Sequence, residues 1–93
     1  MIVSFADRDA ERLFLRKRVR RLDPRVHKKA LMKLLLLDAV HELGELRIPP
    51  GNRLEALKGD RIGQHSIRIN DQWRICFVWT VAGPSEVEIV DYH

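Results

Sequence analysis

The chain has 93 residues, so the sequence predicts a single domain over residues 1–93. Hydrophobic residues make up 45% and charged residues 32%, which excludes an intrinsically disordered chain and fits a globular one. The longest apolar run, residues 34–37, is too short to span a membrane, and the N-terminus lacks signal-peptide features, so we expect a cytoplasmic protein. The formal net charge of +4 favours an anionic partner, either a nucleic acid or an acidic protein.

The first half of the chain is predicted to contain a short strand and two helices. Residues 2–5 favour the strand. Residues 7–21 repeat apolar side chains at helical spacing and begin with Asp7 as a plausible N-cap, so we expect a helix over this range. Asp23-Pro24 is a second start signal, because Asp caps a helix and Pro is tolerated at its first position. The second helix is therefore predicted over residues 24–40.

The predicted second helix carries apolar residues on two sides. Its buried stripe consists of Val26, Ala30, Leu34 and Leu37. Met32 and Leu36 point to the opposite side, beside basic residues. Two interpretations of this second side remain open: another layer of the fold covers it, or it forms a patch for a partner.

The second half of the chain is predicted to form a loop and then an antiparallel sheet. Residues 41–52 are predicted to be a loop that can include a helical turn, and Pro-Pro-Gly-Asn at residues 49–52 excludes regular structure in that stretch. Beyond residue 52 the period of hydrophobic residues is two, which predicts strands over residues 53–57, 65–70, 73–79 and 86–92. Asn70-Asp71-Gln72 is typical of a turn and joins the two middle strands in a hairpin. The fold class is therefore α+β, with two N-terminal helices packed on a small antiparallel sheet.

The two faces of this sheet differ in chemistry. The face toward the helices is predicted to carry Ile67, Ile69, Ile75, Phe77, Val87 and Ile89. The other face is predicted to carry Ser66, Arg68, Asn70, Arg74, Cys76 and Tyr92. Contact with water is a sufficient reason for a polar face, and binding of a ligand is the alternative.

The polar face carries the groups that RNA cleavage by the RNA's own 2′-hydroxyl requires. Such cleavage needs a base, a cation near the phosphorane and an acid for the leaving oxygen. Arg68 and Arg74 could flank one phosphate, or they could be ordinary solvated arginines. Lys58 and Arg61 lie on a predicted turn, where a plain surface role is equally compatible with their spacing. The last strand ends on Tyr92 and His93, which can stack on a base or move a proton, unless this terminus frays.

Other polar residues give weaker signals. Nine of the seventeen Lys and Arg residues lie within residues 16–33, which indicates either a solvated helix face or a wall that docks on ribosomal RNA. His27, His41 and His65 lack metal-ligand spacing, so we expect no metal site and no cofactor. Cys76, the only cysteine, is predicted to be a packing residue.

Three segments resemble the HigB (killer protein) branch of the RelE/ParE toxin superfamily: residues 52–61, 66–75 and 87–93. The resemblance implies a microbial-RNase-like fold and a ribosome-dependent endoribonuclease that cuts translated mRNA in the decoding site. It also implies a helix-turn-helix antitoxin of the HigA type, which would form a hetero-oligomeric complex with this chain and bind operator DNA.

The resemblance also assigns site residues. Its motifs place the following in the active site: Lys58, Arg74, Asp91, Tyr92 and His93. Asn70 stands where a principal catalytic arginine aligns, and Arg68 is the nearest substitute. Glu55 stands where some members have a histidine, and a carboxylate there could act as the base. Asn70, Arg61 and Glu55 are expected to bind substrate. A ParE-like poison of DNA gyrase without nuclease chemistry, or an inactive member of the fold, are the alternatives.

Overall fold

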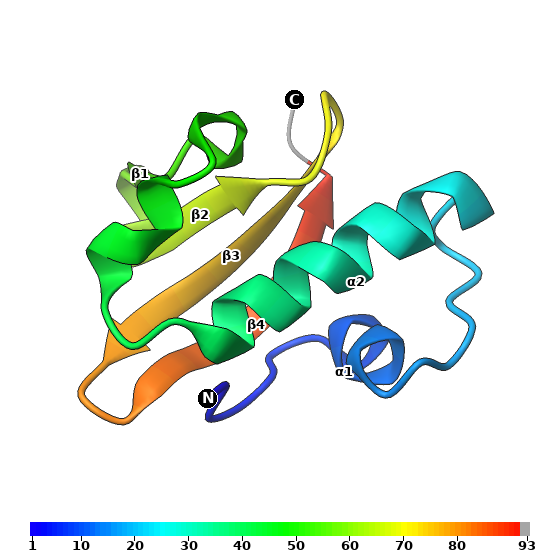
Figure 1. Cartoon of the computed structure of the whole chain (residues 1–93), viewed down its shortest axis with the longest axis horizontal. Coiled ribbons are helices and arrows are strands. Elements are labelled where there is room, and N and C mark those ends of the chain that lie inside the picture. The colour runs from blue at the N-terminus through cyan, green and yellow to red at the C-terminus, as the bar shows by residue number, and fades with distance from the viewer. Residues whose placement is uncertain (92–93) are drawn as a thin grey trace.

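The computed structural model describes residues 1–91 and has the predicted α+β architecture (Figure 1). Two helices, α1 (Arg8–Phe14) and α2 (Pro24–Ala39), lie against one face of a four-stranded antiparallel sheet. The strands are β1 (Glu55–Ala56), β2 (His65–Arg68), β3 (Trp73–Thr80) and β4 (Gly83–Asp91), in the order β1-β2-β3-β4. Three short 3₁₀ helices complete the described fold: η1 (Leu43–Arg47), η2 (Pro50–Asn52) and η3 (Gly59–Arg61).

The N-terminal segment runs beside β4 but forms less of a strand than predicted. Phe5 makes a single parallel bridge with Val87, and Val3 N–H donates to the Pro84 carbonyl at 2.7 Å. The β4 backbone is irregular here, because Glu86 adopts a φ of +52°. This irregularity interrupts a regular ladder, so the expected strand over residues 2–5 is reduced to one bridge.

The first helix ends at Phe14, so the prediction that it continues to residue 21 is wrong. Arg16 adopts a left-handed φ of 62°, its N–H donates to the Leu13 carbonyl at 2.9 Å, and Lys17 N–H donates to the Arg12 carbonyl at 2.8 Å. This pair of bonds is a Schellman motif, which satisfies the last helical carbonyls. Glycine is the usual residue at the left-handed position of this motif, and in this chain that residue is Arg16.

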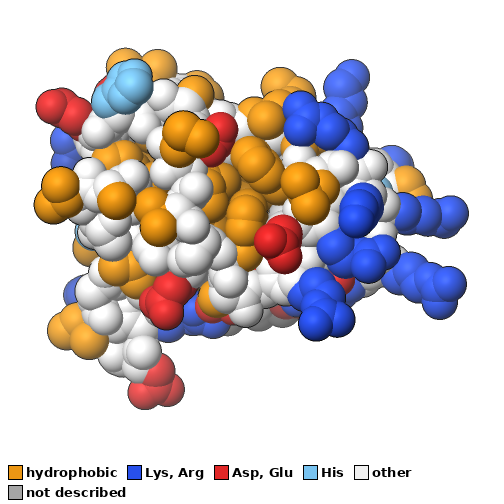
Figure 2. Space-filling view, turned by 90° about the horizontal axis from the view of Figure 1, so that it is seen from below, with side chains coloured by type: hydrophobic (Ala, Val, Ile, Leu, Met, Phe, Trp, Pro, Cys, Tyr) orange, Lys and Arg blue, Asp and Glu red, His pale blue; other side chains and the backbone are white. Residues whose placement is uncertain are grey.

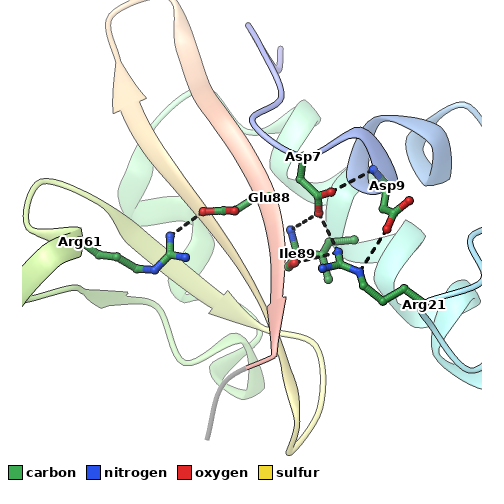
Figure 3. Close-up of polar contacts among 6 residues, drawn as sticks. All are labelled: Asp7, Asp9, Arg21, Arg61, Glu88 and Ile89. Carbon is green, nitrogen blue, oxygen red and sulfur yellow. Dashed lines mark hydrogen bonds and ion pairs between the residues drawn. The ribbon is translucent and has the colours of Figure 1, made fainter.

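The segment between the helices is fixed to the sheet by Arg21 (Figure 3). Its Nη2 lies 2.8 Å from Asp7 Oδ2 and donates to the Ile89 carbonyl at 3.0 Å, while its Nε lies 3.2 Å from Asp9 Oδ2. The guanidinium also lies over the Trp73 ring, 5.4 Å from its centroid. These contacts join the start of α1, the irregular segment and β4, so the chain needs no helix there to be held in place.

The second helix begins and ends within one residue of its predicted bounds. Asp23 caps it by accepting from Arg25 N–H at 2.8 Å, and Pro24 is its first residue. Ala30, Leu34 and Leu37 are fully buried, as predicted, whereas Val26 is only half-buried. Met32 is 60% exposed, so no second layer within residues 1–91 covers it.

The hydrophobic core lies between the helices and the predicted apolar face of the sheet. It includes all six residues predicted for that face, Ile67, Ile69, Ile75, Phe77, Val87 and Ile89. The opposite face is less open than predicted, because Ser66, Arg74 and Cys76 are buried. The segment between β1 and β2 folds over this face. A 3₁₀ turn, η2, also forms within residues 49–52, where regular structure was excluded, because Pro is tolerated at the first position of such a turn.

Candidate active site

A pocket of about 300 Å³ lies at the end of the polar face, beside the turn between β2 and β3. Its lining residues are Arg53, Arg68, Asn70, Asp71 and Arg74. The hairpin register places Arg68 directly opposite Arg74 on the same face, as the alternation predicted. Three arginines and one carboxylate therefore line this pocket, and arginine is the side chain that binds two phosphate oxygens at once.

Arg74 is a buried, oriented arginine rather than a solvated one. Its side chain crosses to β2 and to the segment before β1, where Nε donates to Ser66 Oγ at 2.8 Å and Nη2 donates to the Arg53 carbonyl at 2.7 Å. A weaker contact of 3.4 Å joins Nη2 to the Ser66 carbonyl. Arg74 is only 7% exposed. A charged group held in this way keeps its orientation without reorganisation when a ligand arrives.

Arg68 and Asn70 are both engaged in the structure of the turn. Arg68 forms an ion pair with Asp71, and its Nε donates to the Asn70 carbonyl at 3.1 Å. The side-chain oxygen of Asn70 accepts from Gln72 N–H at 2.9 Å and from Trp73 N–H at 2.8 Å. Asn70 therefore builds the turn, and the charge of Arg68 is partly balanced by a carboxylate.

Lys58 and Arg61 lie on the predicted tight turn, but they differ in environment. Gly59 has a φ of 63°, as that turn requires, and Lys58 is exposed. Arg61 instead reaches across the sheet face to Glu88 on β4, with 2.6 Å between Nη1 and Oε1 (Figure 3). This hydrogen bond raises the pKa of Arg61. Arg61, which was expected to bind substrate, is thus occupied in holding the turn onto the sheet.

Glu88 is a residue of the polar face that the sequence reasoning missed. The register pairs it with Cys76, so alternation along β4 places it on the same face as Arg74. That alternation was the available signal. Glu88 lies beside Cys76, which is buried and packs in the fold as predicted. Burial raises the pKa of the Cys76 thiol.

The remaining predicted site residues lie around this face or outside the described range. Glu55 is exposed on β1 and pairs with Ser66, the residue that holds Arg74. Asp91 ends β4 opposite Trp73, and its Oδ2 accepts from Gln72 Nε2 at 3.1 Å. Tyr92 and His93 lie outside the described residues, so their predicted roles stay predictions.

The histidines have structural surroundings in the described chain. His27 contacts the Val19 carbonyl at 2.7 Å, and His65 stacks on Phe77 with 6.3 Å between ring centroids. Residues 1–91 contain no group of three or more His, Cys, Asp or Glu residues that could hold a metal ion. Within the same range, no helix is both long and apolar enough to cross a bilayer.

Basic residues also gather at the end of the molecule where α1 and the following segment lie, as Figure 2 shows. A pocket of about 600 Å³ there is lined by Arg8, Asp9, Arg12, Arg18, Val19, Arg20 and Arg21. A neighbouring α1–α2 groove of about 430 Å³ is lined by Leu13, Arg16, Lys17, Arg18, His27, Lys28 and Leu31. This groove combines an apolar floor with a cationic rim and has no acidic lining residue.

Comparisons with known proteins agree with this architecture. A model of the family described as RelE-like toxin of type II toxin-antitoxin system HigB matches residues 3–93. Toxin HigB-1 of Vibrio cholerae serotype O1 is 42% identical over 80 residues, which cover 85% of this chain and 84% of that protein. The YoeB/ParE toxin from Agrobacterium tumefaciens has a similar fold, with a TM-score of 0.55, 22% identity and coverage of 99% of this chain and 98% of its own.

These findings define the class of protein as a RelE-like toxin of a type II toxin–antitoxin system. Within that class, the chain belongs to the HigB-like toxin family. Membership implies that an antitoxin is its partner. The alternative of a gyrase poison is not favoured, because the matching family and relative are both of the HigB type.

Proposed function

We propose that this toxin is an endoribonuclease that cleaves translated mRNA on the ribosome. The observation that carries the proposal is the pocket of three arginines, in which Arg74 is buried and oriented by Ser66 and by the Arg53 carbonyl. Fixed donors aimed at a phosphate are the main requirement for stabilising a phosphorane. Membership of the HigB-like family supports the same conclusion.

In the proposed reaction the 2′-hydroxyl of the RNA attacks the adjacent phosphorus. A base removes the hydroxyl proton, the 5′-oxygen leaves with a proton from an acid, and the products are a 2′,3′-cyclic phosphate and a 5′-hydroxyl end. Arg74 and Arg68 stabilise the phosphorane, and exposed Lys58 approaches it from the turn that Gly59 makes possible. Because the nucleophile belongs to the RNA, this chemistry requires no cofactor.

Proton transfer is proposed for carboxylate and terminal residues. Glu55 lies on β1, paired with Ser66, and is a candidate base at the side of the pocket. The resemblance to HigB toxins assigns the other roles to Asp91, Tyr92 and His93, and we expect Tyr92 to stack on a base or to hydrogen-bond the RNA.

The proposed partners follow from the same family. The antitoxin is proposed to be a HigA-type helix-turn-helix protein that forms a hetero-oligomer with the toxin and contacts operator DNA itself. The ribosome is proposed as the second partner, with the decoding site as the place of cleavage. The arginine-lined pocket next to α1 supports contact with ribosomal RNA, since cations at this density attract phosphates.

The experiment that tests the proposal is induction of the toxin followed by mapping of RNA 5′ ends. We expect growth arrest and new 5′ ends inside translated frames, within minutes of induction. Intact mRNA together with arrested DNA replication would refute the nuclease and favour a gyrase poison. No growth effect and no cleavage, with antitoxin binding retained, would identify an inactive member of the fold.

A truncated toxin tests the proposed role of the last two residues in cleavage. Deleting Tyr92 and His93 should abolish cleavage on ribosomes while leaving antitoxin binding and the melting temperature nearly unchanged. Primer extension on a programmed ribosome measures the cleavage. Wild-type activity of the truncated protein would move the active site elsewhere, and loss of folding would assign both residues a structural role.

A further inference from the structure

The candidate pocket has one cation that the sequence reasoning did not assign. The resemblance to HigB toxins places a principal arginine where this chain has Asn70, and Asn70 is engaged in the turn through its side-chain oxygen. Arg68, the substitute expected from the sequence, is paired with Asp71. Arg53, on the segment before β1, lines the same pocket.

The backbone at Arg53 is held in an unusual conformation. Its φ of 46° and ψ of 55° lie in the left-handed region, which is unfavourable for a residue with a side chain. Arg53 N–H donates to the Pro50 carbonyl at 3.1 Å, and the Arg53 carbonyl accepts from Arg74 Nη2 at 2.7 Å. Strained backbone of this kind persists where surrounding contacts fix it, and it is frequent at functional sites.

The residue before it anchors this conformation. Asn52 is fully buried, and its Nδ2 donates to the Leu46 carbonyl at 3.1 Å and to the Ile48 carbonyl at 3.3 Å. Its side-chain oxygen accepts from Lys33 on α2. These hydrogen bonds fix the Asn52 side chain, because breaking any of them would leave a buried polar group unpaired and would lower the stability of the fold. The contacts of Asn52 therefore fix the backbone of the turn at residues 50–53, and with it the point from which the Arg53 side chain extends.

The guanidinium of Arg53 differs from the other two in the pocket. Arg74 is bonded to Ser66 and to a backbone carbonyl, and Arg68 is paired with a carboxylate. Arg53 is exposed, and none of the hydrogen bonds or ion pairs among residues 1–91 involves its side chain. Arg53 lines the same pocket as Arg68 and Arg74, and a planar guanidinium without a competing partner among residues 1–91 suits a phosphate with two oxygens to offer.

We propose that Arg53 is a further catalytic residue of this toxin, which binds the non-bridging oxygens of the scissile phosphate and supplies the positive charge that Asn70 lacks. The proposal rests on the proposed nuclease function. Arg53 and Arg74 then act as a pair in one pocket, linked by the bond between the Arg74 side chain and the Arg53 carbonyl. Substitution of the Arg53 side chain leaves that carbonyl in place.

Three variants test the proposal by single-turnover cleavage on programmed ribosomes. Arg53→Asn removes the guanidinium and keeps a residue type that tolerates the left-handed conformation. Arg53→Lys keeps the charge and loses the fork. Arg47→Asn, at an exposed arginine on η1, is the control with the same change in net charge.

We expect Arg53→Asn to lower the rate constant at saturating toxin by about 10²–10³-fold, as loss of one transition-state donor does. The toxin concentration that gives half the maximal rate should change by only a few-fold, because the contact is stronger in the transition state than in the ground state. Arg53→Lys should be intermediate, and Arg47→Asn should match the wild type. A rate for Arg53→Asn equal to that of Arg47→Asn would overturn the proposal.

A second measurement separates this proposal from the nuclease function itself. The arginine Nε–H resonances of the wild-type toxin are followed by NMR during titration with a trinucleotide that carries a 2′-deoxy sugar at the scissile position. Absence of cleavage by the wild type would refute the nuclease, whereas a shift of Arg53 in this titration would still support a phosphate site there. A titration that shifts Arg68 and leaves Arg53 unchanged would overturn the assignment of Arg53. The Lys variant provides the same test of the site if the Asn variant melts below the assay temperature.

Discussion

Replacing Arg74 with alanine should damage both the stability and the activity of the toxin. The change removes a hydrogen bond of 2.8 Å to Ser66 Oγ and one of 2.7 Å to the Arg53 carbonyl, at a site that is 7% exposed. Buried bonds from a charged donor contribute about 1.5–3 kcal/mol each, so we expect the two to account for a loss of about 3–6 kcal/mol. A domain of 93 residues has a total stability of about 5–14 kcal/mol, which exceeds this loss over most of its range, so we expect the variant to fold at 25 °C.

The two effects are separated by melting and by cleavage of ribosome-bound mRNA. At about 4–8 °C per kcal/mol, a loss of about 3 kcal/mol or more should lower the melting temperature of Arg74→Ala by at least about 12 °C. Its cleavage rate at 15 °C, where it is folded, should fall by about 10²–10³-fold. Ser66→Ala removes one of the two bonds and keeps the cation, so its melting temperature should fall by about half as much and its rate by no more than several-fold. Arg16→Ala, at an exposed position, should change neither quantity appreciably.

Two results would refute this reasoning. An unchanged melting temperature for Arg74→Ala would show that the buried bonds contribute nothing to the fold. Equal cleavage rates for Arg74→Ala and Arg16→Ala, measured on protein of matched circular dichroism, would show that the charge of Arg74 plays no part in the reaction.

Three further predictions concern the contacts that hold the fold and its partners. Asp7→Ala removes a helix cap, an ion pair and a bond to the β4 backbone, so calorimetry should show a loss of about 2–4 kcal/mol, and a loss under 0.5 kcal/mol would contradict the structure. Reversing the charge of either Arg61 or Glu88 should lower the melting temperature, and exchanging the two residues in one variant should restore most of the loss. If the losses of the two single variants simply add in the double variant, the two side chains do not stabilise each other. We expect the α1–α2 groove, with its apolar floor and cationic rim, to bind the antitoxin. Lys28→Glu, on that rim, should then weaken antitoxin binding by about tenfold in titration calorimetry, whereas Arg47→Glu should not; equal effects would show that the groove is not the interface.

Local sequence signals were sufficient for the elements whose ends depend on neighbouring residues. Asp23 and Pro24 place the start of α2 because a cap and a permitted proline act within one helical turn. The hairpin between β2 and β3 follows from the turn at residues 70–72, where the Asn70 side chain bonds to backbone two and three residues on. Alternation then determined which side of each strand faces the helices.

Tertiary structure decided the features that join residues far apart in the chain. Arg16 adopts the left-handed conformation that ends α1, and no glycine at that position signals it in the sequence. The burial of Arg74 depends on its bond to the Arg53 carbonyl, 21 residues earlier in the chain. Arg61 and Glu88 meet across 27 residues because a turn folds over the sheet. Arg53 joins the pocket for the same reason: only the folded chain brings the segment before β1 against the β2–β3 turn. Periodicity assigns a side chain to a face, but the partner that it meets there is set by packing between segments.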